Sequence, residues 1–215
     1  MPVRKIPKNY RSVTGTFPSL KNNRSISFES TLERDFYLSL EFDNSVASYE
    51  EQPLTINGNI NGCSVSYTPD CLAQHIDDSQ TLFEVKYTTD LEKDAEELAP
   101  RFDLAKRYVR EHDIAFCIVT ELDIRCVKLD NQRFLYAFSL APKNLTNIQN
   151  TILNHLNEPL TLESLLLSLS PERIKQAAFI PAIWHLVFTG ALKIDIDIPI
   201  TNKSIITVNH GTYNY

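Results

Sequence analysis

Apolar residues near the start of the chain recur with a helical period. Leu32, Phe36 and Leu40 follow one another every four residues in the segment FESTLERDFYLSLEFD, which gives one apolar helix face about three turns long. Ser30 and Glu33 form a capping-box pair, in which the serine and glutamate side chains satisfy the first backbone N–H groups. The pattern therefore predicts a helix that begins directly after Ser30.

The pattern then changes to short segments rich in β-branched and aromatic residues. Residues 45–87 contain several such segments, separated by Asn-Gly pairs at Asn57 and Asn61 and by Asp77-Asp78. This alternation is typical of strands that are joined by tight turns. We expect three or four strands here.

A second helical pattern, over residues 89–113, precedes an apolar run. Pro100 lies inside this pattern and predicts a break or kink, because proline has no backbone N–H to donate. The run IAFCIVT, residues 114–120, predicts a fully buried strand. The order helix, antiparallel strands, helix, strand indicates an α/β fold, with a mixed sheet flanked by helices.

After residue 142, short helices with clear start signals replace the strands. Thr146 is predicted to cap a helix over 147–156, and Thr161 to cap the segment LESLLLSL. Ser170 is predicted to cap a third helix that has Pro171 at its first position.

Gly190 is predicted to end the third helix. The segment ALKIDIDIPITNKSIITV then alternates like a two-stranded hairpin, over Lys193–Ile198 and Ser204–Val208. Three helices followed by a hairpin predict a small C-terminal winged-helix domain over residues 143–215.

Composition limits the class of protein. The chain has 215 residues, of which 43% are hydrophobic, so it can bury a full core as one large domain or one domain plus a small one. The four cysteines include no C-x-x-C pair and the five histidines never pair at i, i+4, which argues against a zinc site. The segment MPVRKIPKNYRSVTG lacks the apolar stretch of a signal peptide or membrane span. We expect a cytoplasmic protein without membrane contact.

Charge is distributed unevenly along the chain. Residues 1–24 carry six Lys and Arg and no acidic residue, whereas the whole chain has a net charge of −6 and a pI of about 5.4. Because Lys and Arg supply most sequence-independent affinity for DNA phosphates, an acidic DNA-binding enzyme needs a metal ion, a local basic arm or a partner. We expect residues 1–24 to form a basic N-terminal arm, either contacting DNA or forming a flexible terminus.

Asp70 and the triplet Glu84-Val85-Lys86 give the strongest chemical signal. They supply the only Pro-Asp pair and the only acidic-x-Lys triplet of the chain. Alternation along a strand places Glu84 and Lys86 on one side. Asp70 and Glu84 could hold Mg²⁺ with the backbone carbonyl of Val85, and Lys86, with its pKa lowered by its surroundings, could orient or deprotonate the water that attacks a phosphodiester. From the residues alone, a solvated strand face remains the alternative.

The order of elements around these residues is that of the PD-(D/E)-x-K nuclease core. The segments FESTLERDFYLSLEFDNSVASYEEQPLTI, YTPDCLA and LFEVKY resemble the TnsA-type endonucleases of heteromeric cut-and-paste transposons, and IWHLVFTGALKIDIDIPIT resembles the winged-helix domain of that family. The resemblance implies an endonuclease domain over residues 25–142 with a restriction-endonuclease-like mixed sheet flanked by helices. It places the helical catalytic glutamate on Glu33, the metal-binding aspartate on Asp70 and the strand pair on Glu84 and Lys86, although some relatives carry Gln at the Glu84 position.

The same resemblance implies a reaction and partners. A TnsA-type protein nicks the 5′ ends of the transposon DNA with Mg²⁺, which Mn²⁺ can replace, while a DDE-type transposase subunit cuts and joins the 3′ ends. It also contacts an AAA+ regulator that selects the target. Because the sequence ends at Tyr215, soon after the predicted hairpin, we expect the C-terminal tail with which longer relatives contact the regulator to be absent.

Two other functional classes stay open. A stand-alone restriction or repair nuclease with the same core should cut DNA without a partner and carry its own basic groove, which the acidic balance disfavours. A non-catalytic DNA- or protein-binding scaffold would be expected to have lost a core residue, whereas all four positions are filled. Glu33 by itself is fully explained as a helix cap, and the resemblance alone favours a catalytic role for it.

The remaining charged features are assigned structural roles. The acidic segment 90–98 predicts a solvated helix face directed away from DNA. Glu50-Glu51 could lie near the site, but a solvated strand end is the preferred interpretation. We expect His112 and His185 in a helix cap or the core. The segment AFIPAIWHLVF, residues 178–188, is apolar nearly all round, which predicts a buried helix that does not read bases.

Overall fold

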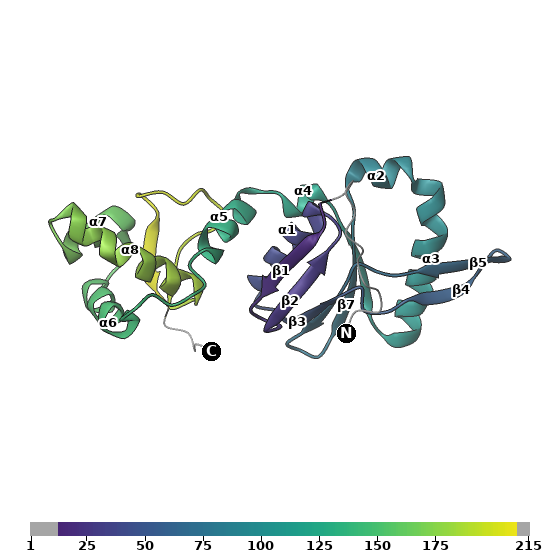
Figure 1. Ribbon diagram of the computed structural model, residues 1–215, viewed down its shortest axis with the longest axis horizontal. Helices are drawn as coiled ribbons and strands as arrows, with labels where there is room; N and C mark the ends of the chain where they lie inside the picture. The colour runs from purple at the N-terminus through teal and green to yellow at the C-terminus, as the bar shows by residue number, and fades with distance from the viewer. Residues whose placement is uncertain (1–12, 210–215) are drawn as a thin grey trace. The chain divides into compact units, whose positions relative to one another are not determined.

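The computed structural model describes residues 13–209, which divide into two units at Cys126 and Val127 (Figure 1). The predicted boundary lay after residue 142. The difference arises because helix α5, Val127–Tyr136, packs against helix α8, Arg173–Phe188, and so belongs to the second unit.

A four-stranded mixed sheet forms the centre of the first unit, in the order β3-β6-β7-β8. The first three strands are antiparallel and β8 runs parallel to β7. This confirms the predicted class of fold at the level of a mixed sheet flanked by helices. The strand bounds are β3 Val46–Glu51, β6 Cys71–His75, β7 Gln80–Val85 and β8 Ala115–Val119.

Different elements cover the two faces of this sheet. Helix α1, Thr31–Glu41, lies on one face, where the ring of Phe36 contacts Phe83 at a centroid distance of 5.0 Å. On the other face Leu82 packs with Leu104 of helix α3, Ala95–His112. Since successive residues of a strand point to opposite faces, Glu84 lies on the same face as Leu82.

Strands β4, Ile56–Ile60, and β5, Cys63–Tyr67, form a separate hairpin beside α3 (Figure 1). The predicted turn at Asn61-Gly62 is confirmed, since both residues have positive φ. The predicted turn at Asn57-Gly58 is wrong, because Gly58 lies inside β4. A Cβ atom at Gly58 would lie 2.5 Å from Cδ1 of Leu104, so the glycine permits close packing of α3.

The helical segment after β7 is interrupted, but at a different place than predicted. Helix α2, Thr88–Lys93, ends at Asp94, and α3 continues through Pro100. The strand after α3 is β8, which is half-buried or exposed along its length instead of fully buried. The reason is its place at the edge of the sheet, where only β7 pairs with it. The short helix α4, Glu121–Ile124, follows.

The structure begins with a hairpin inside the segment assigned to the basic arm. Strand β1, Gly15–Ser19, pairs with β2, Arg24–Phe28. Arg24 forms a two-pronged ion pair with Glu51, at 2.6 and 2.8 Å, so Glu51 is buried and not solvated as expected. The ammonium of Lys21 donates to the backbone carbonyls of Asp43 and Val46. Residues 1–12 lie outside the described part of the chain.

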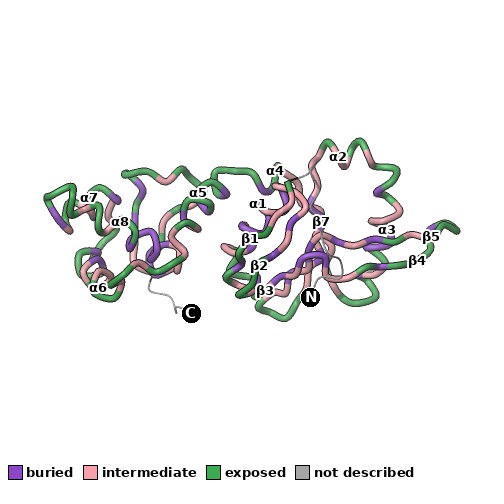
Figure 2. Tube along the Cα trace, in the orientation of Figure 1, coloured by how far each residue is buried: buried purple, intermediate pink, exposed green. Residues whose placement is uncertain are grey.

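The second unit contains α5, three further helices and a small sheet of order β10-β11-β9. Its elements follow one another as two helices, a strand, two helices and two strands. Their bounds are α6 Leu145–His155, β9 Leu160–Thr161, α7 Leu162–Leu169, α8 Arg173–Phe188, β10 Leu192–Lys193 and β11 Ile205–Val208. Figure 2 colours the buried stretches of the chain purple. The large side chains that are fully buried in this unit include Ile152, Leu165, Ile183, Leu186, Leu192 and Ile206.

Several predicted helix ends in this unit are confirmed and others are wrong. Thr161 caps α7 through a bond from Ser164 N–H, and Gly190 ends α8 with positive φ. Helix α6 begins after Asn144 in place of Thr146. Helix α8 begins at Arg173, because the Ser170 hydroxyl accepts from Glu172 N–H in a turn that precedes the helix.

The predicted hairpin is shorter than expected on its first side. Only Leu192 and Lys193 form a strand there. The amide of Asn131, on α5, donates to the carbonyls of Ile196 and Ile198, so these groups do not pair with β11. Helix α8 is buried from Ala182 to Val187 and largely exposed before it, which confirms only half of the predicted burial.

Among residues 13–209, no helix is both long enough and apolar enough to cross a membrane.

Candidate active site

The ladder between β6 and β7 brings Asp70 and Glu84 side by side. Cys71 is paired with Phe83, so the preceding residue Asp70 lies beside Glu84 at the end of β7. The backbone N–H of Val85 donates to Asp70 Oδ2 at 2.8 Å. Asp70 precedes β6 in the connection from β5, as the sequence predicts.

Lys86 follows the last residue of β7 and extends the parallel ladder, since its N–H donates to the carbonyl of Val119. Its ammonium lies 3.2 Å from Glu84 Oε1. The Glu84 carboxylate is only 3% exposed, whereas the Lys86 side chain is 34% exposed. The triplet therefore presents a buried acid and a partly exposed cation, and their contact agrees with the prediction that both side chains lie on one side of the strand.

Glu33 sits in the first turn of α1, where it is 8% exposed. Its backbone N–H donates to the Ser30 hydroxyl, and its carboxylate accepts from Glu29 N–H at 2.8 Å. The predicted cap is thus present, with the carboxylate reaching one residue further back than in a standard capping box. Glu33 is also close enough to Lys86 for the two charges to attract.

Three carboxylates around one lysine set the electrostatics of this cluster. Burial raises the pKa of Asp70 well above its usual range, and the charges of Glu84 and Glu33 raise it further against the opposing effect of Lys86. Burial also raises the pKa of Glu33. Burial lowers the pKa of Lys86, but the charges of Asp70, Glu84 and Glu33 outweigh burial and raise it overall. The expected lowering of the Lys86 pKa is therefore wrong, and the residue is held as an ammonium.

Tyr67 is a member of this cluster that the sequence analysis does not identify. Its hydroxyl donates to Glu84 Oε2 at 2.6 Å from a side chain that is 5% exposed. Its ring meets Phe102 and Phe116 edge-on. Burial and the charge of Glu84 raise the Tyr67 pKa, so the hydroxyl stays protonated. The only signal in the sequence was an aromatic residue three positions before Asp70. Aromatic residues are common in strands, so this signal does not distinguish a site residue.

The cluster offers oxygen atoms of the kind that Mg²⁺ prefers. Within residues 13–209, no three Asp, Glu, His or Cys side chains are arranged to hold a metal ion by themselves. Mg²⁺ commonly uses one or two carboxylates and keeps several waters, so Asp70, Glu84 and the carbonyl of Val85 could hold it. The crowding of negative charge around Asp70 is what a divalent cation would relieve, and the donor set fits this ion.

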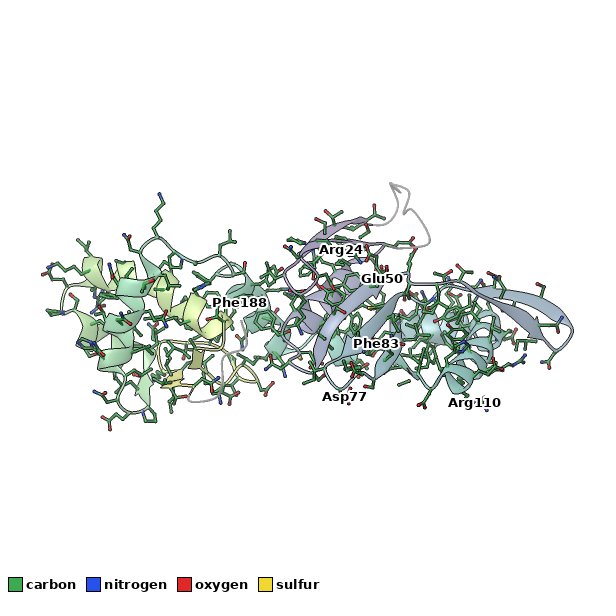
Figure 3. All side chains as sticks on the ribbon, turned by 90° about the horizontal axis from the view of Figure 1, so that it is seen from below. Arg24, Glu50, Asp77, Phe83, Arg110 and Phe188 are labelled. Atoms are coloured by element: carbon green, nitrogen blue, oxygen red, sulfur yellow. The ribbon has the colours of Figure 1, made fainter. Side chains whose placement is uncertain are left out.

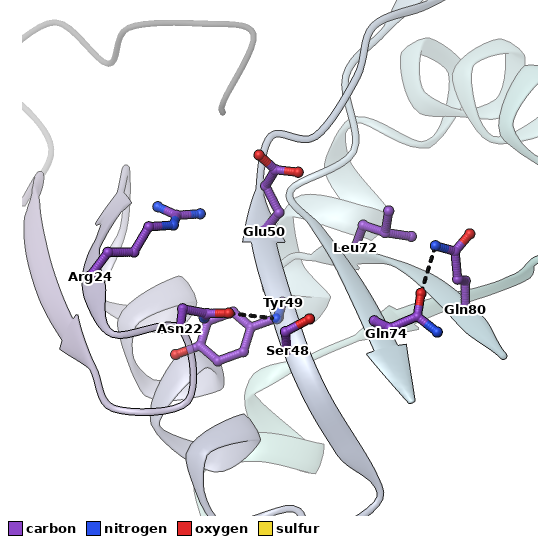
Figure 4. Close-up of a pocket in the computed structure, with 8 residues that line it drawn as sticks. All are labelled: Asn22, Arg24, Ser48, Tyr49, Glu50, Leu72, Gln74 and Gln80. Carbon is purple, nitrogen blue, oxygen red and sulfur yellow. Dashed lines mark hydrogen bonds between the residues drawn. The ribbon is translucent and has the colours of Figure 1, made fainter. Parts of the chain in front are cut away.

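The ladder places Leu72 and Gln74 on the sheet face of Glu84, and these two residues help to line an open polar depression (Figure 4). It has a volume of about 360 Å³ and is lined by Asn22, Arg24, Ser48, Tyr49, Glu50, Leu72, Gln74 and Gln80. Leu72 is two residues from Asp70, which corresponds to about 7 Å along a strand. Gln80 Nε2 donates to Gln74 Oε1 in its floor. Figure 3 shows Arg24 and Glu50 near each other at one side of the unit, whereas Arg110 lies on the side of α3.

The structure thus brings Asp70, Glu84 and Lys86 together at the C-terminal end of β7. Residues 43–121 match the family model described as TnsA-like endonuclease N terminal. This TnsA-like segment runs from the start of β3 into α4 and contains those three residues. Glu33 and the second unit lie outside it. No curated protein shows significant similarity to the chain.

The TnsA-like segment supports nuclease chemistry for the first unit. The two histidines predicted to be structural behave as expected, whereas Glu51 is buried against Arg24. His185 is buried and its Nδ1 bonds the carbonyl of Phe138, and His112 Nδ1 bonds the carbonyl of Tyr108 near the end of α3.

Proposed function

We propose that this protein is a Mg²⁺-dependent DNA endonuclease with a PD-(D/E)-x-K active site. The observation that carries the proposal is the junction of Asp70, Glu84 and Lys86 within the TnsA-like segment. The element order around them, helix, antiparallel strands, helix and parallel strand, supports the same core. The relevant chemistry is phosphodiester hydrolysis.

Each residue has a definable task in this reaction. Asp70 and Glu84, with the carbonyl of Val85, would hold the cation, which would supply positive charge to a phosphate oxygen and to the attacking water. Lys86 is an ammonium, so it donates a hydrogen bond to the attacking water or a phosphate oxygen and offsets phosphate charge. Glu33 adds a further carboxylate from α1, which can accept a proton from the water.

The bonds around Glu84 keep it in place for this task. Lys86 binds one of its oxygens and Tyr67 binds the other. A carboxylate whose two oxygens are both engaged loses little further conformational freedom when it binds a cation. The main chain contributes in the same way at Asp70, through the N–H of Val85.

We further propose that the protein acts as one subunit of a transposase and nicks the 5′ ends of transposon DNA. A DDE-type transposase subunit would cut the 3′ ends, and an AAA+ regulator would select the target. The acidic net charge of −6 supports dependence on a partner for DNA affinity. The order helix, strand, two helices and hairpin in the second unit supports a winged helix, whose use would be contact with DNA or a partner.

The test is a Lys86→Ala variant assembled with its transposase partner on a transposon-end substrate. We expect 5′ nicking to fall at least about 100-fold, so that products shift from excised transposon to joined donor and target molecules. Lys106→Ala, which removes an exposed lysine of α3, is the matched control and should cut normally. Normal excision by Lys86→Ala would refute the assignment, and strong cutting of plasmid by the isolated wild-type chain would favour a stand-alone nuclease.

A further inference from the structure

Gln52 directly follows strand β3 and is paired with Asp70 through the main chain. Its N–H donates to the carbonyl of Asp70 at 3.0 Å, and the Tyr37 hydroxyl donates to the same carbonyl at 3.2 Å. The φ of Gln52 is +42°, a backbone region that residues other than glycine rarely adopt. Such conformations are retained where surrounding structure requires them, often at functional sites.

The side chain of Gln52 is 6% exposed, and only one end of its amide is satisfied. Nε2 donates to Glu29 Oε1 at 3.1 Å. Oε1 is buried and accepts no hydrogen bond, and it is the one such side-chain atom found among residues 13–209. Turning the amide over would point Oε1 at the Glu29 carboxylate, so the observed orientation is the chemically sound one. A buried acceptor without a donor is costly, and native structures rarely keep one without a reason.

The surroundings of this oxygen are rich in acceptors. Glu29, which binds the amide, donates its own N–H to the Glu33 carboxylate. Gln52 is therefore bonded to Asp70 through its main chain and to Glu29, which directly precedes the N-cap of α1, through its side chain. It connects the segments that carry Asp70 and Glu33. The lysine of the cluster, Lys86, is paired with Glu84. An electropositive group that bound here would satisfy the amide oxygen and the crowded carboxylates together.

We propose that Gln52 is a further oxygen donor of the cation site, binding the divalent ion or a water molecule that the ion holds. The inference rests on the proposed function, because it takes the ion to be the one bound by Asp70 and Glu84. It adds a neutral ligand, which increases the number of oxygens without adding to the negative charge of Asp70, Glu84 and Glu33. Gln52 would thus be a metal-positioning residue and not a proton carrier.

The experiment measures Mn²⁺ binding to the full chain by electron paramagnetic resonance, without DNA cleavage as a readout. Gln52→Met replaces the amide by an apolar side chain of similar length. We expect its affinity for Mn²⁺ to fall at least about 10-fold relative to the wild type, as for other groups that support metal ligands. Gln74→Met removes a glutamine from the same sheet and should bind Mn²⁺ like the wild type. Asp70→Ala should abolish specific binding.

The outcomes separate this inference from the proposed function. Equal affinity of Gln52→Met and Gln74→Met, with binding lost in Asp70→Ala, would overturn the role of Gln52 and leave the cation site standing. Absence of Mn²⁺ binding by the wild type would overturn the cation site itself. If Gln52→Met does not fold by circular dichroism, Gln52→Glu decides, because it keeps the oxygen and adds a charge. Tighter Mn²⁺ binding by Gln52→Glu would support the inference, and unchanged or weaker binding would overturn it.

Discussion

Removing the hydroxyl of Tyr67 should weaken both the stability of the first unit and its nuclease chemistry. In the wild type this hydroxyl donates to Glu84 Oε2 at 2.6 Å in a buried setting. Tyr67→Phe keeps the ring contacts with Phe102 and Phe116 but leaves one carboxylate oxygen without its donor. A hydrogen bond to a charged group contributes roughly 1.5–3 kcal/mol, so we expect a loss of about 2 kcal/mol.

Hydrogen exchange resolved by peptide is the suitable assay, because the chain has two units and its single tryptophan, Trp184, lies in the second. A loss of about 2 kcal/mol corresponds to roughly 30-fold faster exchange of amides that open with the unit. Strands β6 and β7 should show this change, whereas β10 and β11 should not. Cleavage by Tyr67→Phe should fall as well, since Glu84 is then held only by Lys86.

Tyr49→Phe is the matched control for this change. Tyr49 is also buried and its hydroxyl also donates to a carboxylate, that of Glu41, at 2.7 Å. Glu41 keeps other donors, including the Ser19 hydroxyl, so the loss of stability should be smaller and cleavage should be normal. If Tyr67→Phe exchanges and cuts like the wild type, the bond to Glu84 contributes neither to stability nor to the site, and the reasoning is wrong.

Three further changes test other parts of the cluster and its supports. Glu33→Gln keeps an oxygen for the helix cap, so exchange of α1 amides should stay within about threefold of the wild type while cleavage is lost; normal cleavage would reduce Glu33 to a cap. In Asp70→Asn the side chain still accepts from Val85 N–H. Because the pKa of Asp70 is raised, its contribution to the free energy of unfolding is favourable only at low pH and is lost as the pH rises through that pKa. The stability advantage of the Asn variant over the wild type should therefore grow between about pH 4 and pH 8. A constant advantage would contradict the raised pKa. Arg24→Ala leaves Glu51 buried without its partner and should cost about 2–4 kcal/mol in a urea titration, whereas a purely DNA-binding arm residue would leave the unfolding midpoint unchanged.

The fold of the first unit was largely predictable because its signals are local. The cap at Ser30, the turn at Asn61-Gly62 and the alternation around Glu84 each depend on residues within a few positions of one another. The errors occurred where a distant element decided the outcome. Gly58 is a strand residue that pairs with Val65, and a Cβ atom there would meet Leu104, which lies nearly fifty positions further along the chain.

The candidate site shows the same division. Asp70, Glu84 and Lys86 were identifiable because chain order and residue type distinguish them. Tyr67 and Gln52 were not, because a tyrosine in a strand and a glutamine at a strand end have no distinctive local pattern. Their roles follow from bonds to Glu84 and Asp70 that exist only after the hairpin β4–β5 and the ladder β3–β6 have formed.

By itself, the sequence determined the class of fold, the order helix, antiparallel strands, helix and strand from α1 to β8, and the acids and lysine that meet at the end of β7. These depend on period, capping and turn chemistry, which act over a few residues. Only the tertiary structure decided that Lys86 keeps its proton, that Arg24 supports Glu51 and that the amide oxygen of Gln52 is buried without a donor. Burial and charge–charge distance set those properties, and both arise from segments that are far apart in the chain and come together on folding.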